Sequence, residues 1–116
     1  MSARAETLLW LAQRISAMVL AVVVAVHIGT IIYAVQGGLS AQEIIGRVQG
    51  NTGWLAFYGV FVAAVAVHGP IGLRTILREM TPVPARLIDV AAAVFAVLLA
   101  WTGWQAAYGL YGFGGA

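Results

Sequence analysis

Three long apolar stretches, separated by short polar segments, make up most of this chain. They cover about residues 7–35, 54–77 and 85–109. A helix needs roughly 20 apolar residues to cross the hydrocarbon core of a bilayer, and each stretch meets that length. We therefore predict an all-α membrane protein with three transmembrane helices, built as a single membrane-anchor domain over residues 1–116.

The polar segment between the first two stretches holds a helix stop and a helix start. Gly37 and Gly38 follow the first stretch, and paired glycines commonly end a helix. Ser40 and Glu43 stand three positions apart, which is the spacing of a capping box. We predict a short amphipathic helix over residues 41–48 that lies flat on the outer membrane surface.

A proline interrupts the second stretch. Pro70 removes one backbone hydrogen bond and is expected to kink the helix. One interpretation is a kink that serves helix packing. The other is that the kink, together with Gly69, opens space beside His68 for a flat ring.

Composition supports the membrane assignment and excludes several classes of function. The chain is 62% hydrophobic and 9% charged, whereas soluble domains carry about 25% charged residues. Its 116 residues leave no room for a soluble catalytic domain beside three spans. It has no cysteine, which excludes disulfides, thiolate nucleophiles and cysteine-ligated metal sites. No basic patch points to nucleic acid.

The arginines are distributed unevenly between the two ends of the predicted spans. Arg47 alone falls on the side of the short amphipathic helix, and the other five fall on the side of the N-terminus: Arg4, Arg14, Arg74, Arg78 and Arg86. Positive residues favour the cytoplasmic side, so we predict a cytoplasmic N-terminus and an outer C-terminus. We interpret the first stretch as a retained span, and the absence of a transit-like leader favours a bacterial inner membrane.

The only two histidines of the chain, His27 and His68, both lie inside predicted spans. A titratable ring in hydrocarbon is costly and needs a partner. Three roles fit: a hydrogen bond that helps packing, proton relay, or ligation of a haem iron. A bis-histidine iron suits electron transfer. Spacing does not decide between one haem within the chain and two haems that each share a ligand with a partner chain.

Polar groups at the predicted cytoplasmic ends of the first two spans are the other candidates. Arg74 and Arg78 follow His68 by about 9 and 15 Å of helical rise, within reach of haem propionates at the cytoplasmic surface. Positive-inside anchoring would explain them equally well. Arg14 and Ser16 offer a cation and a hydroxyl that could bind a quinone carbonyl or a propionate. The alternative is a snorkelling arginine and a serine bonded to its own helix.

The third stretch is expected to serve structure. Asp89 is predicted to form a salt bridge with one of the arginines 86, 78 and 14. Small residues recur along one face of the same stretch, a pattern more typical of helix packing than of a site; they are Ala92, Ala96, Ala100 and Gly103.

Two runs of residues resemble a known family. The run QRISA at residues 13–17, followed by His27, is similar to an (H/Q)-R-x-S-G signature at the start of a first span. The run HGPIGLR at residues 68–74 is similar to an H-x-x-x-G-(I/L)-R signature whose histidine is an axial ligand of haem b. Through these two runs the chain resembles the three-span cytochrome b membrane anchors of succinate dehydrogenase and fumarate reductase. Ala17 replaces the usual glycine, and Met80 stands where one anchor type has a quinone-contacting tyrosine.

The resemblance implies an electron-transfer and docking subunit without dicarboxylate chemistry of its own. Its partners would be a flavoprotein with FAD, an iron–sulfur subunit that docks on the Arg74–Arg86 region, and a second anchor or second copy of this chain. His68 would ligate haem b, with His27 as a first-span ligand known in some branches. Arg14 and Ser16 would serve quinone and a propionate. The rival interpretations are a haem-free scaffold or assembly subunit, and a small proton-relay channel subunit.

Overall fold

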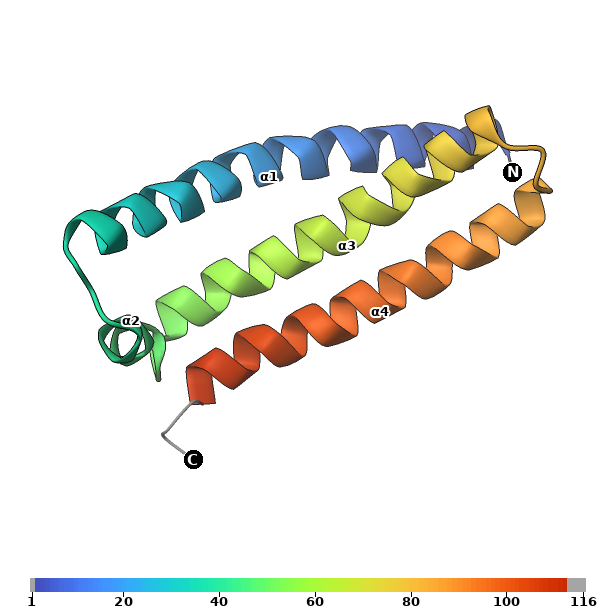
Figure 1. The fold of residues 1–116 in the computed structure, drawn as a ribbon. Helices are drawn as coiled ribbons and strands as arrows, with labels where there is room; N and C mark the ends of the chain where they lie inside the picture. The colour runs from blue at the N-terminus through green and yellow to red at the C-terminus, as the bar shows by residue number, and fades with distance from the viewer. Residues whose placement is uncertain (1, 113–116) are drawn as a thin grey trace.

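The computed structural model describes residues 2–112 and is helical throughout, apart from short connections (Figure 1). The three predicted spans are confirmed, and each helix extends one to four residues past at least one of its predicted ends. The short helix falls on the predicted residues. In chain order the helices are α1 (Ala3–Gln36), α2 (Ala41–Val48), α3 (Thr52–Met80) and α4 (Ala85–Gly112).

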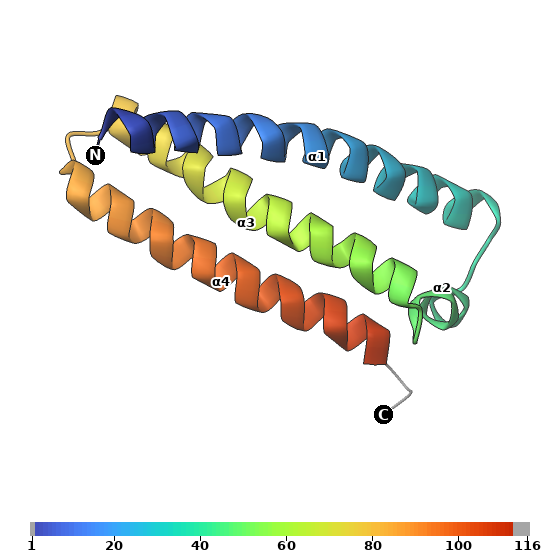
Figure 2. The same cartoon turned by 180° about the vertical axis from the view of Figure 1, so that it is seen from behind.

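The three long helices lie side by side, with α3 in the middle (Figures 1 and 2). Helix α3 packs against both α1 and α4. The N-terminus and the α3–α4 connection lie at one end of the bundle, which we call the arginine-rich end. Helix α2 lies across the opposite end, which we call the α2 end. The cytoplasmic location of the arginine-rich end stays a prediction.

Small residues allow α3 and α4 to approach closely. A Cβ atom added to Gly103 of α4 would lie 2.8 Å from Cγ1 of Val62 on α3, closer than carbon atoms pack. Ala92 and Ala107 of α4 are buried, while Ala100 is exposed. The predicted packing role of this helix face is therefore confirmed at Gly103 and Ala92, and Ala100 lies outside the contact.

Large apolar side chains cover the outer surfaces of the long helices. Examples are Val22 and Val35 on α1 and Val97 on α4, which are 65%, 74% and 68% exposed. Each long helix is apolar enough, over a sufficient length, to cross a membrane. Lipid is the solvent that such a surface requires, because soluble monomers rarely expose apolar patches of this extent.

Helix α3 continues without interruption through Pro70. The space beside Gly69 is already filled, because an added Cβ there would lie 3.4 Å from Cδ1 of Leu99 and 3.8 Å from Cε2 of Phe95. Gly69 therefore lets α4 pack against α3. Gly69 itself therefore opens no space for a flat ring, and the His68 side chain faces α1 instead.

The α2 end is held by caps and turns. The predicted capping box is confirmed: the Glu43 amide donates to the Ser40 hydroxyl, and the Ser40 amide donates to the Glu43 carboxylate. Gly50 adopts a left-handed conformation with φ of 67°, which favours glycine. Its amide donates to the carbonyl of Tyr111 at 2.8 Å, which joins the turn after α2 to the end of α4.

Candidate functional site

His68 and Ser16 meet at the interface of α3 and α1. The side chain of Ser16 is almost fully buried, with 5% of the residue exposed. Its hydroxyl donates a hydrogen bond to the carbonyl of Gln13, one turn earlier, at 3.0 Å. The same oxygen lies 3.5 Å from Nδ1 of His68. The structure therefore brings together two residues that the sequence assigned to different ligands.

The second ring nitrogen of His68, Nε2, has no hydrogen-bond partner within residues 2–112. It is also not one of the buried nitrogen or oxygen atoms that lack a partner in this part of the chain. Nε2 is therefore not fully enclosed by the three helices. Gly72 lies one turn further along α3 on the same face, where an added Cβ would contact the Gln13 amide nitrogen at 3.4 Å.

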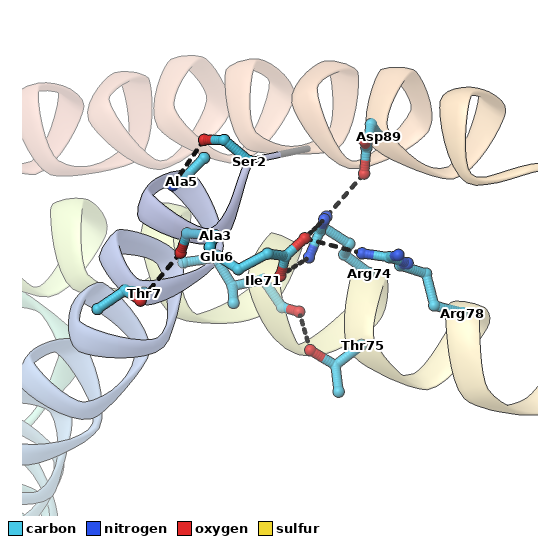
Figure 3. Close-up of polar contacts among 10 residues, drawn as sticks. All are labelled: Ser2, Ala3, Ala5, Glu6, Thr7, Ile71, Arg74, Thr75, Arg78 and Asp89. Atoms are coloured by element: carbon cyan, nitrogen blue, oxygen red, sulfur yellow. Dashed lines mark hydrogen bonds and ion pairs between the residues drawn. The ribbon is translucent and has the colours of Figure 1, made fainter.

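A cluster of charged residues joins all three long helices at the arginine-rich end (Figure 3). Arg74 of α3 is 7% exposed. Its Nη2 lies 2.8 Å from a Glu6 carboxylate oxygen of α1, and its Nε lies 2.7 Å from Asp89 of α4. Arg78 also reaches Glu6, at 3.0 Å. Asp89 forms a salt bridge as predicted, but its partner is Arg74 and not one of the three arginines that the sequence suggested.

The guanidinium groups predicted to meet haem propionates are thus engaged by carboxylates. A propionate could bind Arg74 only in competition with Glu6 and Asp89. Arg14 is different, because it is exposed and stacks on the Trp10 ring, with 5.2 Å between the guanidinium carbon and the ring centroid. None of the ion pairs found in the described part of the chain involves Arg14.

His27 occupies a different environment on α1. The edges of two α3 rings surround it, with centroid distances of 5.9 Å to Tyr58 and 5.7 Å to Phe61. Its Nδ1 is buried and has no hydrogen-bond partner.

The same ring borders a cavity of about 560 Å³ near the α2 end. Apolar side chains of α1 and α2 form most of its wall, and Trp54 and Tyr58 close one side. Arg47, at the rim, stacks over the Tyr33 ring at 5.6 Å.

Comparison with known proteins places this chain in a family. The family described as "Succinate dehydrogenase/Fumarate reductase transmembrane subunit" matches residues 1–103. The chain belongs to this family. No curated protein and no solved structure matches it. The recognition drawn from the two sequence runs is confirmed, and the transmembrane subunit of such a complex implies partner subunits and a bilayer.

Of the two histidines in this transmembrane subunit, His68 has the arrangement that a haem ligand needs. A metal-bound histidine coordinates through one nitrogen and donates the N–H of the other to an acceptor. His68 has the Ser16 oxygen beside Nδ1 and an accessible Nε2. His27 borders a cavity, but its Nδ1 lacks an acceptor. The residues present therefore fit haem b at His68 more completely than at His27.

The transmembrane subunit does not bring its two histidines together. His68 lies at the level of Ser16 on α1, and His27 lies three helical turns further along that helix, about 16 Å away by helical rise. This spacing favours the alternative in which each histidine belongs to a separate site.

Sequence reasoning assigned no site role to three residues that the structure places at these sites. Glu6 bridges Arg74 and Arg78, Arg47 stands at the rim of the cavity, and Gln13 has a buried amide oxygen without a partner. An available signal for Glu6 was that it is an acidic residue close before a span, opposite several arginines. The role of Arg47 depends on how α2 folds back, which local pattern does not reveal.

Proposed function

We propose that this chain is a haem b-binding anchor of a succinate:quinone or fumarate:quinone oxidoreductase. It passes electrons from the iron–sulfur subunit to membrane quinone and performs no dicarboxylate chemistry itself. The observation that carries the proposal is the His68 ring, whose Nδ1 faces Ser16 while Nε2 stays accessible. Bound haem would supply one-electron transfer, and this chain would supply an axial ligand and an apolar surface.

The second axial ligand of that haem comes from a partner chain. His27 is too distant, and the sequence has no further histidine. The accessible side of His68 opens at the surface of the bundle, where a second anchor or a second copy of this chain would pack. A haem held between two anchor chains would also cover part of the exposed apolar surface.

Quinone binding is assigned to the part of α1 near the arginine-rich end. Arg14 is exposed there and can donate to a quinone carbonyl. An apolar groove of about 400 Å³ lies between α1 and α3, with Ser16 and Val67 among its lining residues, and would receive the hydrocarbon chain of the quinone. The iron–sulfur subunit would dock at the same end, on exposed residues such as Arg78 and Arg86. We place this end at the cytoplasmic face of a bacterial inner membrane.

A separate role for His27 is supported by the cavity near the α2 end. The cavity combines an imidazole, apolar walls and the Arg47 guanidinium at its rim. Those three features fit a second haem, with His27 as a ligand and Arg47 paired with a propionate. This would be the arrangement in which two haems each share their ligands with a partner chain.

A reduced-minus-oxidised spectrum of the purified complex, with haem quantified per chain, tests the proposal. A b-type band that His68→Ala removes is the expected result. A second b-type haem that only His27→Ala removes would establish the second site. Absence of a b-type band from the intact complex would overturn the haem role and favour the scaffold or proton-relay interpretation.

A further inference from the structure

We propose that Ser16 is a positioning residue for His68, which fixes the orientation and tautomer of the imidazole so that Nε2 faces the iron. The proposal rests on the haem role proposed for His68. It gives Ser16 a function different from the quinone contact expected from the sequence. Its basis is the arrangement of three groups at the α1–α3 interface: the Gln13 carbonyl, the Ser16 hydroxyl and the His68 ring.

The direction of the hydrogen bonds follows from the chemistry of a hydroxyl group. Serine has one hydrogen to donate, and here it points to the Gln13 carbonyl at 3.0 Å. The lone pairs of the same oxygen are then left for His68 Nδ1, which lies 3.5 Å away. In this arrangement Ser16 accepts a hydrogen bond from Nδ1 of His68. A neutral imidazole with its hydrogen on Nδ1 carries its lone pair on Nε2.

No other side chain competes for this role. Within residues 2–112, Ser16 is the only side chain within hydrogen-bond distance of the His68 ring. Gln13 lies about one turn closer to the arginine-rich end, beside Gly72, and its amide oxygen has no partner. Ser16 is 5% exposed, and its hydroxyl hydrogen is already used in the bond to the Gln13 carbonyl, so none is left to donate to a quinone carbonyl.

The hydrogen bond has an electronic consequence as well as a geometric one. A ligand histidine that donates its second N–H is a stronger base towards the metal. A stronger base stabilises the oxidised iron more than the reduced iron, so the bond lowers the midpoint potential of the haem. Removing the Ser16 oxygen should raise that potential and loosen the ring. Loss of an outer partner of this kind typically costs about 10- to 100-fold in metal affinity.

The test compares three substitutions at this position in the intact complex: Ser16→Ala, Ser16→Cys and Ser16→Thr. The measurements are the midpoint potential of the b-type haem, by optical redox titration, and the haem retained per chain after detergent washing. Thr102→Ala is the matched control, because the Thr102 hydroxyl also bonds its own helix, at 2.7 Å to the Leu98 carbonyl, and no hydrogen bond joins it to either histidine in the described part of the chain.

We expect Ser16→Ala to raise the midpoint potential and to lower haem retention about 10-fold or more. Ser16→Cys, which keeps the size but accepts hydrogen bonds weakly, should fall between Ala and the parent. Ser16→Thr should keep the parent potential, because the hydroxyl is restored. Thr102→Ala should change neither measurement.

Two results would overturn the positioning role. One is a Ser16→Ala complex with parental potential and parental haem retention. The other is a Ser16→Ala complex whose haem is unchanged while its apparent affinity for quinone falls, since Ser16 would then be a quinone contact. Absence of b-type haem from the parent complex would instead overturn the proposed function. This outcome is distinguishable from failure of the positioning role, because it is measured before any substitution is made.

Discussion

The two histidines of the bundle differ in what surrounds their Nδ1 atoms. Nδ1 of His68 has a buried hydroxyl beside it, whereas Nδ1 of His27 is buried without a partner. A buried polar atom without a hydrogen bond costs about 1–3 kcal/mol. The fold therefore orients the first ring through a polar contact, and holds the second only between two aromatic edges.

The same contrast extends to the charges at the two ends. At the arginine-rich end, Arg74 joins three helices through two carboxylates. At the α2 end, Arg47 contacts an aromatic ring and borders a cavity, and no carboxylate pairs with it in the described part of the chain. One end uses its arginine to hold helices together, and the other leaves its arginine available to a ligand.

The largest effect that the comparison predicts is on haem content. His68→Ala should remove the b-type haem proposed at the α1–α3 interface, because no other histidine of this chain can replace the ligand. His27→Ala should leave that haem in place, since the ring lies about 16 Å away by helical rise. Haem per chain in the purified complex, from the pyridine haemochrome spectrum, measures both. If the two substitutions remove the same haem, the separation into two sites is wrong.

The next effect concerns stability and contrasts the two arginines. Arg74→Gln should lower the melting temperature of the complex clearly, because it leaves the Glu6 and Asp89 carboxylates without their shared cation. Arg47→Gln should leave the melting temperature nearly unchanged, since exposed cation–π contacts contribute about 0.5–1 kcal/mol. Thermal unfolding in detergent, followed by circular dichroism, compares them directly. An equal decrease in both variants would contradict the assigned structural role of Arg74.

Much of this architecture could be predicted because its causes are local. The three spans follow from apolar length, the short helix follows from the spacing of Ser40 and Glu43, and both are confirmed. The family was also predictable, since residues 13–17 and 68–74 carry its signatures in order. The helix ends differ by a few residues because fraying and capping depend on single hydrogen bonds rather than on hydropathy.

The pairings between helices could not be predicted in the same way. Asp89 could reach several arginines according to the sequence, and only the packing of α4 on α3 selects Arg74. The space expected beside Gly69 depended on which helix Gly69 faces, and Leu99 fills it. The contact between Ser16 and His68 joins residues 52 positions apart. Such contacts depend on how each helix is rotated about its own axis. The apolar pattern of a helix that lies in lipid does not specify that rotation.

A smaller effect is expected at the closest helix contact. Gly103→Ala should destabilise the bundle by about 1–3 kcal/mol, because the new methyl group would overlap the Val62 side chain at 2.8 Å. Gly109→Ala, on the same helix with no atom within 4 Å of an added Cβ, is the matched control. It should be neutral or slightly stabilising, since alanine favours helix over glycine by about 1 kcal/mol. If the unfolding midpoints of both variants were higher than that of the parent, α3 and α4 would be less closely packed than the structure shows.

The smallest expected effect distinguishes a structural role of His27 from a ligand-binding role. His27→Phe removes the unpaired nitrogen while keeping a ring between Tyr58 and Phe61. If the cavity near the α2 end holds no ligand, the variant should be unchanged or more stable, by at most about 1 kcal/mol. If a ligand is bound through the imidazole, the variant should lose both that ligand and some stability. Melting temperature and haem content of the same preparation distinguish the two cases, because only bound ligand makes the two quantities fall together.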